Sequence, residues 1–358
     1  MSRRRAALVA LAVLAAGCGG VTGTPSTTTT IDVAAPVTIT LLTHDSFAVS
    51  DDVLAAFTAS TGITVDILQG GDAGAVVNQA ILTKDHPIAD VLYGIDTTFL
   101  SRALDEDIFS PYASPRIAVV PDDLVVDPEH RVTPIDVGDV CINYDIAELA
   151  ARNVAPPATL EDLTRPEYAG MLVVEDAATS SPGLAFLLAT IGVFGEEGAY
   201  PWTDYWEDLR DNDVLVVTDW EQAYFSAFSG GAGSGDRPLV VSYASSPPAE
   251  MVLSDPPPAT APTGSLAAGC YRQIELAGVL RGAEHPEAAA RFVDFLLSLE
   301  FQQDIPLSMF VYPVRPDATL PEVFVANTTT PVDPVILPAA AIAANRERWI
   351  ETWTEVMR

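Results

Sequence analysis

The first candidate binding segment follows a short apolar run, Leu239–Ser242. After this run come a tyrosine, three small residues and a proline: Tyr243, Ala244, Ser245, Ser246 and Pro247. The run has the length and residue types of a buried strand, and open α/β sheets bind ligands just beyond the carboxyl ends of their strands. An aromatic face beside small hydroxyl groups suits a flat, polar, small ligand. The alternative is a half-buried tyrosine that only packs at a strand end.

A second polar group stands where a long apolar helix, Leu184–Phe194, is expected to begin. Ser180 and Ser181 lie just before Pro182 and Gly183. Proline suits the first helical turn because no amide hydrogen is needed there, and free amides at a helix start attract an anion or a carbonyl. The two serines therefore indicate either a small polar ligand site or a plain N-cap.

Three further positions could contact a ligand. Trp220 follows a strand-like run, Val214–Thr218, and an indole there can stack on a flat ring or a cation. Asp72, followed by Ala73, lies in a glycine-flanked loop where its carboxylate could meet a cationic ligand. Phe310 opens a late aromatic group. Core packing is the alternative for both aromatic residues, and simple solvation is the alternative for Asp72.

No catalytic or metal-binding motif stands out. Ser180 and Ser246 have no identifiable histidine base, and neither a nucleophile elbow nor a phosphate-binding glycine loop is present. The histidines are scattered and lack the spacing of zinc ligands: His44, His86, His130 and His285. The sequence therefore predicts a binding protein that is not an enzyme and has no cofactor or metal. An extracellular hydrolase with a cleft carboxylate is the alternative of another class.

The elements that would position these groups alternate between strand and helix. Apolar runs and helical periodicity between Thr38 and Leu104 give a β-α-β-α-β-α order, which predicts a parallel, doubly wound sheet. A second α/β unit follows, and Tyr271–Leu280 alternates like a strand that returns to the first. We expect an α/β, two-lobe clamshell, each lobe a mainly parallel sheet flanked by helices. Its parts are 37–140 for the first part of lobe 1, 141–270 for lobe 2, and 271–358 for the return to lobe 1 and a C-terminal helix.

The first residues have the pattern of an export signal. A basic start precedes the apolar run Ala6–Ala16, which is too short to span a bilayer, and small residues precede Cys18. This resembles the lipobox of bacterial lipoproteins, which implies a signal peptide at 1–17 and a lipid on the Cys18 sulfur. The Ser, Thr, Gly and Pro-rich segment 18–36 predicts a flexible tether. We expect an extracytoplasmic protein anchored to the cell membrane by lipid alone.

The net charge indicates which ligands the chain favours, and the cysteines indicate a possible disulfide. The chain has 18 Lys and Arg against 49 Asp and Glu, a formal net charge of −31. Such a chain repels nucleic acid and anionic lipid headgroups and favours a cationic ligand. We expect a monomer. Once Cys18 carries lipid, Cys141 and Cys270 remain, and outside the cell such a pair permits one disulfide.

Several short runs, in order along the chain, resemble the thiamine-binding substrate-binding proteins of bacterial ABC transporters. These belong to a clamshell class that includes ferric-ion and polyamine binders, so the resemblance implies a fold of the type II periplasmic-binding-protein kind. The matching runs are Thr43–Phe47, Ala89–Asp96, Thr179–Gly183, Asp219–Tyr224, Val241–Pro247 and Val311–Val314. The resemblance implies that thiamine or a thiamine phosphate binds in the interlobe cleft and is delivered to a permease. The same fold binding a polyamine or ferric ion is the alternative.

The resemblance also implies roles for the candidate residues. Asp72 and Ala73 fall in the loop that meets the ligand, and Ser180 and Ser181 fall where a hydroxyl or phosphate tail would lie. Trp220 falls on the stacking tryptophan. The segment from Tyr243 through Ala244, Ser245 and Ser246 to Pro247 falls on the loop that cradles the rings.

Three aromatic positions depart from the family pattern. His44 stands where some members have tyrosine, Ala249 where an additional stacking tyrosine is found, and Phe310 in place of a tryptophan. These changes permit a related ligand, such as a thiamine precursor.

Overall fold

The computed structural model describes residues 37–231 and 233–358. The predicted export signal, Cys18 and the tether at 18–36 lie outside these residues and stay predictions. The α-helices are α1 (Asp51–Thr61), α2 (Ala73–Leu82), α3 (Leu100–Asp105), α4 (Ile146–Ala151), α5 (Ser181–Phe194), α6 (Trp202–Asp211), α7 (Pro247–Leu253), α8 (Pro286–Leu296), α9 (Leu299–Ser308), α10 (Glu322–Asn327) and α11 (Ala339–Val356). Short 3₁₀ turns are η1 (Ile117–Val119), η2 (Asp122–Leu124), η3 (Glu161–Thr164) and η4 (Pro166–Tyr168), and η5 (Gln222–Ala227) is π-helical.

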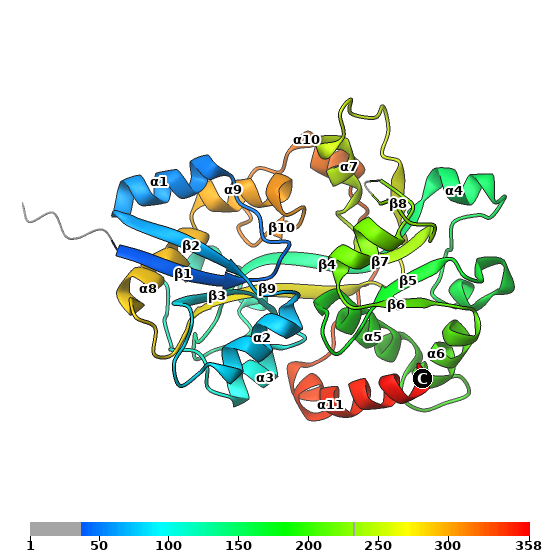
Figure 1. Ribbon diagram of the computed structural model, residues 1–358, viewed down its shortest axis with the longest axis horizontal. Coiled ribbons are helices and arrows are strands. Elements are labelled where there is room, and N and C mark those ends of the chain that lie inside the picture. The colour runs from blue at the N-terminus through cyan, green and yellow to red at the C-terminus, as the bar shows by residue number, and fades with distance from the viewer. Residues whose placement is uncertain (1–36, 232) are drawn as a thin grey trace, which may run out of the picture. The chain divides into compact units, whose positions relative to one another are not determined.

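The strands are β1 (Val37–Thr43), β2 (Ile63–Gln69), β3 (Val91–Asp96), β4 (Thr133–Asp145), β5 (Leu172–Glu175), β6 (Leu215–Val217), β7 (Leu239–Tyr243), β8 (Thr263–Ser265), β9 (Tyr271–Val279) and β10 (Tyr312–Pro313). In the described part of the chain they form one sheet in the order β2-β1-β3-β9-β4-β7-β5-β6, with β8 and β10 also paired to β4 (Figure 1).

The sheet is parallel at both ends and antiparallel in the middle. Strand β1 runs parallel to β2 and β3, and β5 runs parallel to β6 and β7. Between these ends, β4 and β9 pair antiparallel with each other and with β7 and β3. The α/β class is therefore confirmed, and parallel pairing holds within each end. Residues 36–358 form one compact unit by their contacts, so the division into lobes at 140 and 270 stays a prediction.

Strand β1 shows why the first end of the sheet is covered on both faces. Leu42 packs with Val77 of α2 on one face, whereas Leu41 packs with Phe57 of α1 on the other. Parallel strands buried on both faces read as continuous apolar runs because alternate side chains enter opposite layers. The helices thereby hold the ends of the strands in fixed positions.

Helix α5 organises the other end of the sheet. It contacts β4, β5, β7 and β9, and α6 covers its outer side. Trp202 and Trp206 of α6 are buried against it. Helix α11, red in Figure 1, contacts both α6 and α3, so it lies against elements from both ends of the sheet.

Four α-helices were not expected from the sequence: α4, α6, α7 and α10. Helix α6 carries buried aromatic and apolar residues at helical spacing, a signal that was present. The sequence predicts a turn before Pro247, and Ala244 and Ser245 do form a turn, but Pro247 then begins α7. Proline is compatible with a first helical turn because its missing amide hydrogen would have no partner there.

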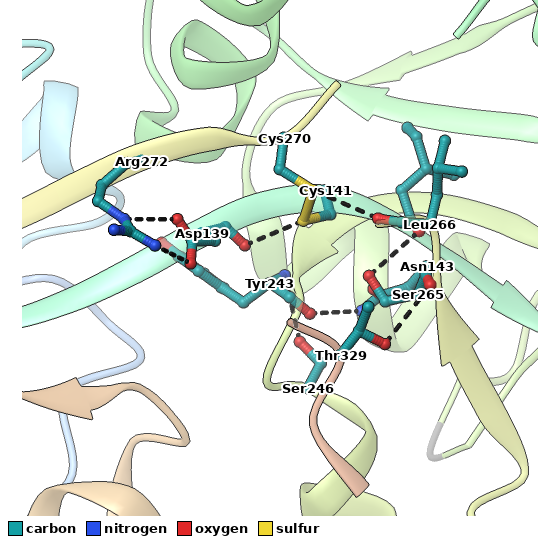
Figure 2. The surroundings of a disulfide bond; sticks show 11 residues. Asp139, Cys141, Asn143, Tyr243, Ser246, Ser265, Leu266, Cys270, Arg272 and Thr329 are labelled. Carbon is teal, nitrogen blue, oxygen red and sulfur yellow. Dashed lines mark hydrogen bonds and ion pairs between the residues drawn. A yellow bond between two sulfur atoms is a disulfide. The ribbon is translucent and has the colours of Figure 1, made fainter. Parts of the chain in front are cut away.

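A disulfide joins Cys141 of β4 to Cys270, just before β9, with an S–S distance of 2.05 Å. The two cysteines are buried with Ala244. Figure 2 shows that this bond lies beside Tyr243 at the end of β7. The disulfide therefore ties the two central strands together next to the first candidate segment.

No helix within the described residues is both long enough and apolar enough to cross a bilayer.

Candidate ligand-binding site

A cavity of ≈ 370 Å³ opens at the strand ends and collects most of the candidate residues. Its size lies within the range of small-molecule sites. The predicted residues that line it are His44, Asp72, Ala73, Ser181, Trp220, Tyr243, Ser246 and Phe310. Ala249, the position noted for a missing aromatic ring, lines it as well. Segments from both ends of the sheet thus meet around one space.

Four predicted contact residues do not line this cavity: Ser180, Ala244, Ser245 and Pro247. The Ser180 hydroxyl instead caps α5 and accepts a hydrogen bond from the Gly183 amide at 3.4 Å. Ala244 packs against the disulfide. Ser245 is fully buried, and Pro247 is buried at the start of α7. Sequence reasoning placed the whole loop against the ligand, whereas only Tyr243 and Ser246 of its five residues line the cavity.

A chain of hydroxyl groups holds Trp220 and Tyr243 in place. The Trp220 indole donates to Ser242 Oγ at 3.0 Å, and Ser242 Oγ lies 2.9 Å from Ser246 Oγ. Ser246 Oγ also accepts from the Tyr243 amide at 3.2 Å. These bonds hold the Trp220 indole and the backbone of Tyr243. Ser246 therefore supports both residues in addition to lining the cavity.

Trp220 belongs to an aromatic wall that sequence reasoning did not complete. Tyr224 stacks on it with ring centroids 5.0 Å apart and an interplanar angle of 21°. Phe225 meets it edge-on at 5.5 Å. Both additional rings come from the π-helical η5 and line the cavity. Two successive aromatic residues after Trp220 were the available signal.

The Tyr243 ring lies flat against the backbone of β4. A Cβ atom on Gly138 would stand 2.7 Å from both Cδ1 and Cε1 of Tyr243, so only glycine leaves room for this approach. Asn143 Nδ2 donates to the Tyr243 carbonyl at 3.0 Å, as Figure 2 shows. Burial, followed by the nearby Glu275 and Asp96 charges, raises the pKa of Tyr243 well above its usual value. The ring therefore stays a neutral phenol.

Asp72 was expected to be a free charge for a cationic ligand, and the structure shows a different role. Its Oδ1 accepts from the amides of Ala73 at 2.7 Å and Ser181 at 3.4 Å. Its Oδ2 accepts from the Trp220 amide at 3.2 Å. Asp72 thus caps α2 and binds two segments of the opposite wall. This carboxylate is a crosslink across the cavity.

The start of α5 was expected to offer free amides to an anion, but the chain itself fills them. The Ser181 amide is bonded to Asp72, Pro182 has no amide hydrogen, and the Gly183 amide is bonded to Ser180. The Ser181 hydroxyl accepts from Gln273 Nε2 at 2.5 Å. In this arrangement no amide of the first α5 turn is left for a phosphate.

Glu275 is another cavity-lining residue that sequence reasoning did not single out. It lies on β9, lines the cavity, and places Oε1 3.1 Å from Nε2 of His44. Burial alone lowers the pKa of His44, but attraction to Glu275, Asp72 and Asp45 outweighs burial, and the net result is a raised pKa. Burial likewise opposes ionisation of Glu275, yet His44 holds its pKa below the usual value. The two side chains therefore form an ion pair on the cavity wall.

A bulge in β3 makes space for this pair. The β3–β9 register shifts between Tyr93 and Ile95, and Gly94 between them has a φ of 97°. A Cβ atom there would stand 2.3 Å from Cδ2 of His44. Glycine is therefore required both by the left-handed backbone and by the close approach of the imidazole.

Buried acids lie behind Glu275. The Tyr93 hydroxyl donates to Asp136, and burial together with the Glu275 charge raises the pKa of Asp136 well above its usual value. Burial raises the pKa of Asp96 to about 7. Protonated neighbours can donate to Glu275, so the negative charge of this group resides on Glu275.

The cavity is acidic. The carboxylates that line it are Asp45, Asp72, Glu221, Glu250 and Glu275, and no Lys or Arg is among its described lining residues. Within 37–231 and 233–358, no group of three or more His, Cys, Asp or Glu residues is placed to hold a metal ion. Aromatic faces combined with carboxylates are suited to a flat cation.

Comparisons with known proteins agree with this arrangement. The family model described as bacterial extracellular solute-binding protein matches residues 86–250. The thiamine-binding periplasmic protein of Escherichia coli is 30% identical over 329 residues, covering 90% of this chain and 94% of the relative. A solved periplasmic thiamin-binding protein superposes with a TM-score of 0.75 at 27% identity, over 90% of this chain and 96% of the other. Iron-bound HitA of Pseudomonas aeruginosa superposes with a TM-score of 0.69 at 20% identity, over 90% of this chain and 99% of HitA. This likeness shows a common fold.

Proposed function

The chain belongs to the family of the thiamine-binding periplasmic proteins, and on this premise we propose that it binds thiamine in the cavity and delivers it to an ABC importer. The chain covers 94% of the length of its Escherichia coli relative, so the whole binding unit is represented. Its role is capture and delivery, with no chemical change to the ligand. The closing of two lobes around thiamine would then present a surface to the permease.

One observation carries the proposal: aromatic rings and five carboxylates line the same cavity, with no Lys or Arg among its described lining residues. Thiamine joins a permanently positive thiazolium to a flat aminopyrimidine. Cation–π contact with Trp220 or Tyr243 would contribute about 1–2 kcal/mol once water is excluded. The negative lining would add attraction and raise the encounter rate.

The form of the ligand follows from the start of α5. Because the Ser181 and Gly183 amides are already bonded within the chain, a phosphate group would find no amide donor there. It would also face the Asp72 carboxylate. We therefore expect thiamine to bind more tightly than thiamine monophosphate.

Nothing in the cavity resembles a catalytic centre. The Ser246 hydroxyl is bonded to Ser242, and His44 faces Glu275. None of the serines that line the cavity is hydrogen-bonded to a histidine side chain in the described contacts, which the hydrolase alternative would need. The relatives are named for binding.

The lipid anchor belongs to the same proposal. Cleavage before Cys18 and lipid attachment to its sulfur would hold a monomeric protein at the outer face of the cell membrane, with 18–36 as a tether. Retention there keeps the captured vitamin within reach of the permease.

A polyamine is the second candidate, because five carboxylates line the cavity and a polyamine carries several positive charges. Titration calorimetry with thiamine, thiamine monophosphate, spermidine and ferric citrate separates the candidates. We expect tight, saturable binding of thiamine at one site per chain and much weaker heats for spermidine and ferric citrate. Tighter binding of spermidine would transfer the proposal to polyamines.

A further inference from the structure

The His44–Glu275 pair lies on one wall of the cavity. His44 extends from the end of β1 and Glu275 from β9, and each side chain is only 15% exposed. The negative charge on this wall already has a positive partner within the protein. A cationic ligand that approaches Glu275 must therefore compete with His44.

Glu275 differs from Asp45 and Asp72 in the kind of partner it has among the described contacts. Asp72 accepts from backbone amides, and Asp45 accepts from the Gly71 amide at 3.0 Å. The donors in these contacts do not gain or lose a proton near neutral pH. Binding of a cation by these carboxylates therefore does not depend on the protonation state of a partner. Glu275 is held by a titratable cation, which can leave by losing a proton.

We propose that Glu275 is the carboxylate that recognises the positively charged ring of the ligand, and that His44 is a built-in counter-ion which the ligand displaces with release of a proton. This rests on the proposed binding of thiamine. The proton moves from His44 to water or buffer, and no covalent bond in the ligand changes. His44 therefore sets both the selectivity for a cation and the pH at which the cavity is ready to bind it.

The sign of the pH dependence follows from charge. Below the raised pKa of His44, the imidazolium neutralises Glu275 and repels a thiazolium. As the pH rises through that pKa, Glu275 becomes available and affinity increases. For each pKa unit by which the bound ligand lowers the pKa of His44, the protein with neutral His44 binds the ligand about tenfold more tightly than the protein with protonated His44.

Other titratable groups face this pair and must be separated from it. Those around His44 are Glu275, Asp45, Asp72, Glu221 and Tyr93. Those around Glu275 also include Asp136, Asp96 and Tyr243. Ionisation of the carboxylates with raised pKa would also favour a cation at higher pH, so the effect of His44 is the difference between wild type and a variant that cannot be protonated.

The first test counts protons in wild type and needs no variant. Thiamine is titrated calorimetrically in two buffers of different ionisation enthalpy, from about pH 5.5 to about pH 8, with deazathiamine as the control because its thiophene carries no charge. We expect release of up to one proton per thiamine near the pKa of His44 and less for deazathiamine. Equal release for both ligands, or none for thiamine at any pH, overturns the proposal.

The second test uses matched variants. At a pH where Glu275 of the variant is ionised, His44→Gln should release far fewer protons and bind thiamine on the order of tenfold more tightly than wild type, because the competing imidazolium is absent. Glu275→Gln should lose on the order of tenfold or more in affinity for thiamine and far less in affinity for deazathiamine. Glu287→Gln removes an exposed charge on α8 and is the control. It should alter neither the proton release nor the affinity for thiamine.

The two proposals fail in different ways. If wild type binds thiamine but Glu275→Gln loses the same affinity for thiamine and for deazathiamine, Glu275 does not recognise the ligand's charge. This inference then falls while the proposed function stands. If wild type binds neither thiamine nor deazathiamine at any pH, the proposed function falls and this inference with it. Melting curves confirm that each variant is folded before its affinity is interpreted.

Discussion

The Trp220 amide donates to Asp72 Oδ2 at 3.2 Å, although the two residues are separated by 148 positions in the chain. Asp72 begins α2 at one end of the sheet, and Trp220 follows β6 at the other. The same carboxylate holds the first amide of α5. One side chain thus fixes the distance between the walls that would grip a ligand.

Replacing Asp72 by alanine should weaken charged and neutral ligands alike. The variant loses hydrogen bonds that set the geometry of the walls, each worth about 1 kcal/mol, and leaves the charge of Glu275 in place. We expect on the order of tenfold loss for both thiamine and deazathiamine by calorimetry. Asp66→Ala, on the exposed side of β2, is the control. A loss confined to thiamine would restore the original view of Asp72 as the ligand's charge partner.

Trp220 should contribute through its face and through its indole nitrogen separately. Trp220→Ala removes the stacking surface and should cost on the order of tenfold or more in thiamine affinity, since buried aromatic residues dominate such sites. Trp220→Phe keeps a ring but loses the donor to Ser242, so its loss should be smaller. Calorimetry measures both variants. Unchanged affinity in Trp220→Ala would remove this residue from the site.

Gly94→Ala should destabilise the protein more than Gly62→Ala. Both glycines have a left-handed φ, 97° and 73°, so both substitutions strain the backbone, at about 1–3 kcal/mol. A Cβ on Gly94 would stand 2.3 Å from His44, whereas no atom of the described residues lies within 4 Å of one on Gly62. Urea denaturation gives both unfolding free energies, and their difference isolates the contact with His44. Equal losses would show that the imidazole moves aside without cost.

The disulfide should stabilise the fold and the Tyr243 segment together. It closes a loop with a sequence separation of 129, for which the chain-entropy model gives about 4–5 kcal/mol as an upper value. The double change Cys141→Ser and Cys270→Ser should lower the urea midpoint and weaken ligand binding, because Ala244 packs on this bond beside Tyr243. The exported protein should also resist thiol labelling until it is reduced. Two reactive thiols before reduction would contradict the disulfide.

Much of the fold was predictable because periodicity and strand length are local signals. The order of elements from β1 to α3 follows from apolar runs and helical spacing, and the polar groups at the ends of strands were located in the same way. The role of Pro247 was not predictable from composition, since the same proline is compatible with a turn and with a helix start.

The site was only partly predictable, for a physical reason. Aromatic residues at strand ends are rare enough to be noticed, but one acid among 49 Asp and Glu carries no information by itself. Glu275 becomes a candidate only through the pairing of β9 with β3, which brings it beside His44. The role of Asp72 likewise depends on two amides that are distant in sequence.

Asp96 should make the stability of the ligand-free protein fall as the pH rises. Its pKa is raised from 3.8 to about 7, chiefly by burial, so folding favours the protonated form. The stabilisation is fully present below about pH 4 and is lost as the pH rises to about 7, by up to about 4 kcal/mol. Urea denaturation across this range measures the slope.

Asp96→Asn should flatten this slope while preserving the local contacts. In wild type, Asp96 Oδ2 accepts from Gln273 Nε2 at 2.6 Å, and Gln273 Oε1 has no partner among the described residues. Rotation of the Gln273 amide lets Oε1 accept from an asparagine amide at position 96, so the substitution costs little. Because other buried acids also titrate, the measured quantity is the difference in slope between wild type and variant. An unchanged slope would show that Asp96 is ionised in the folded protein throughout this range.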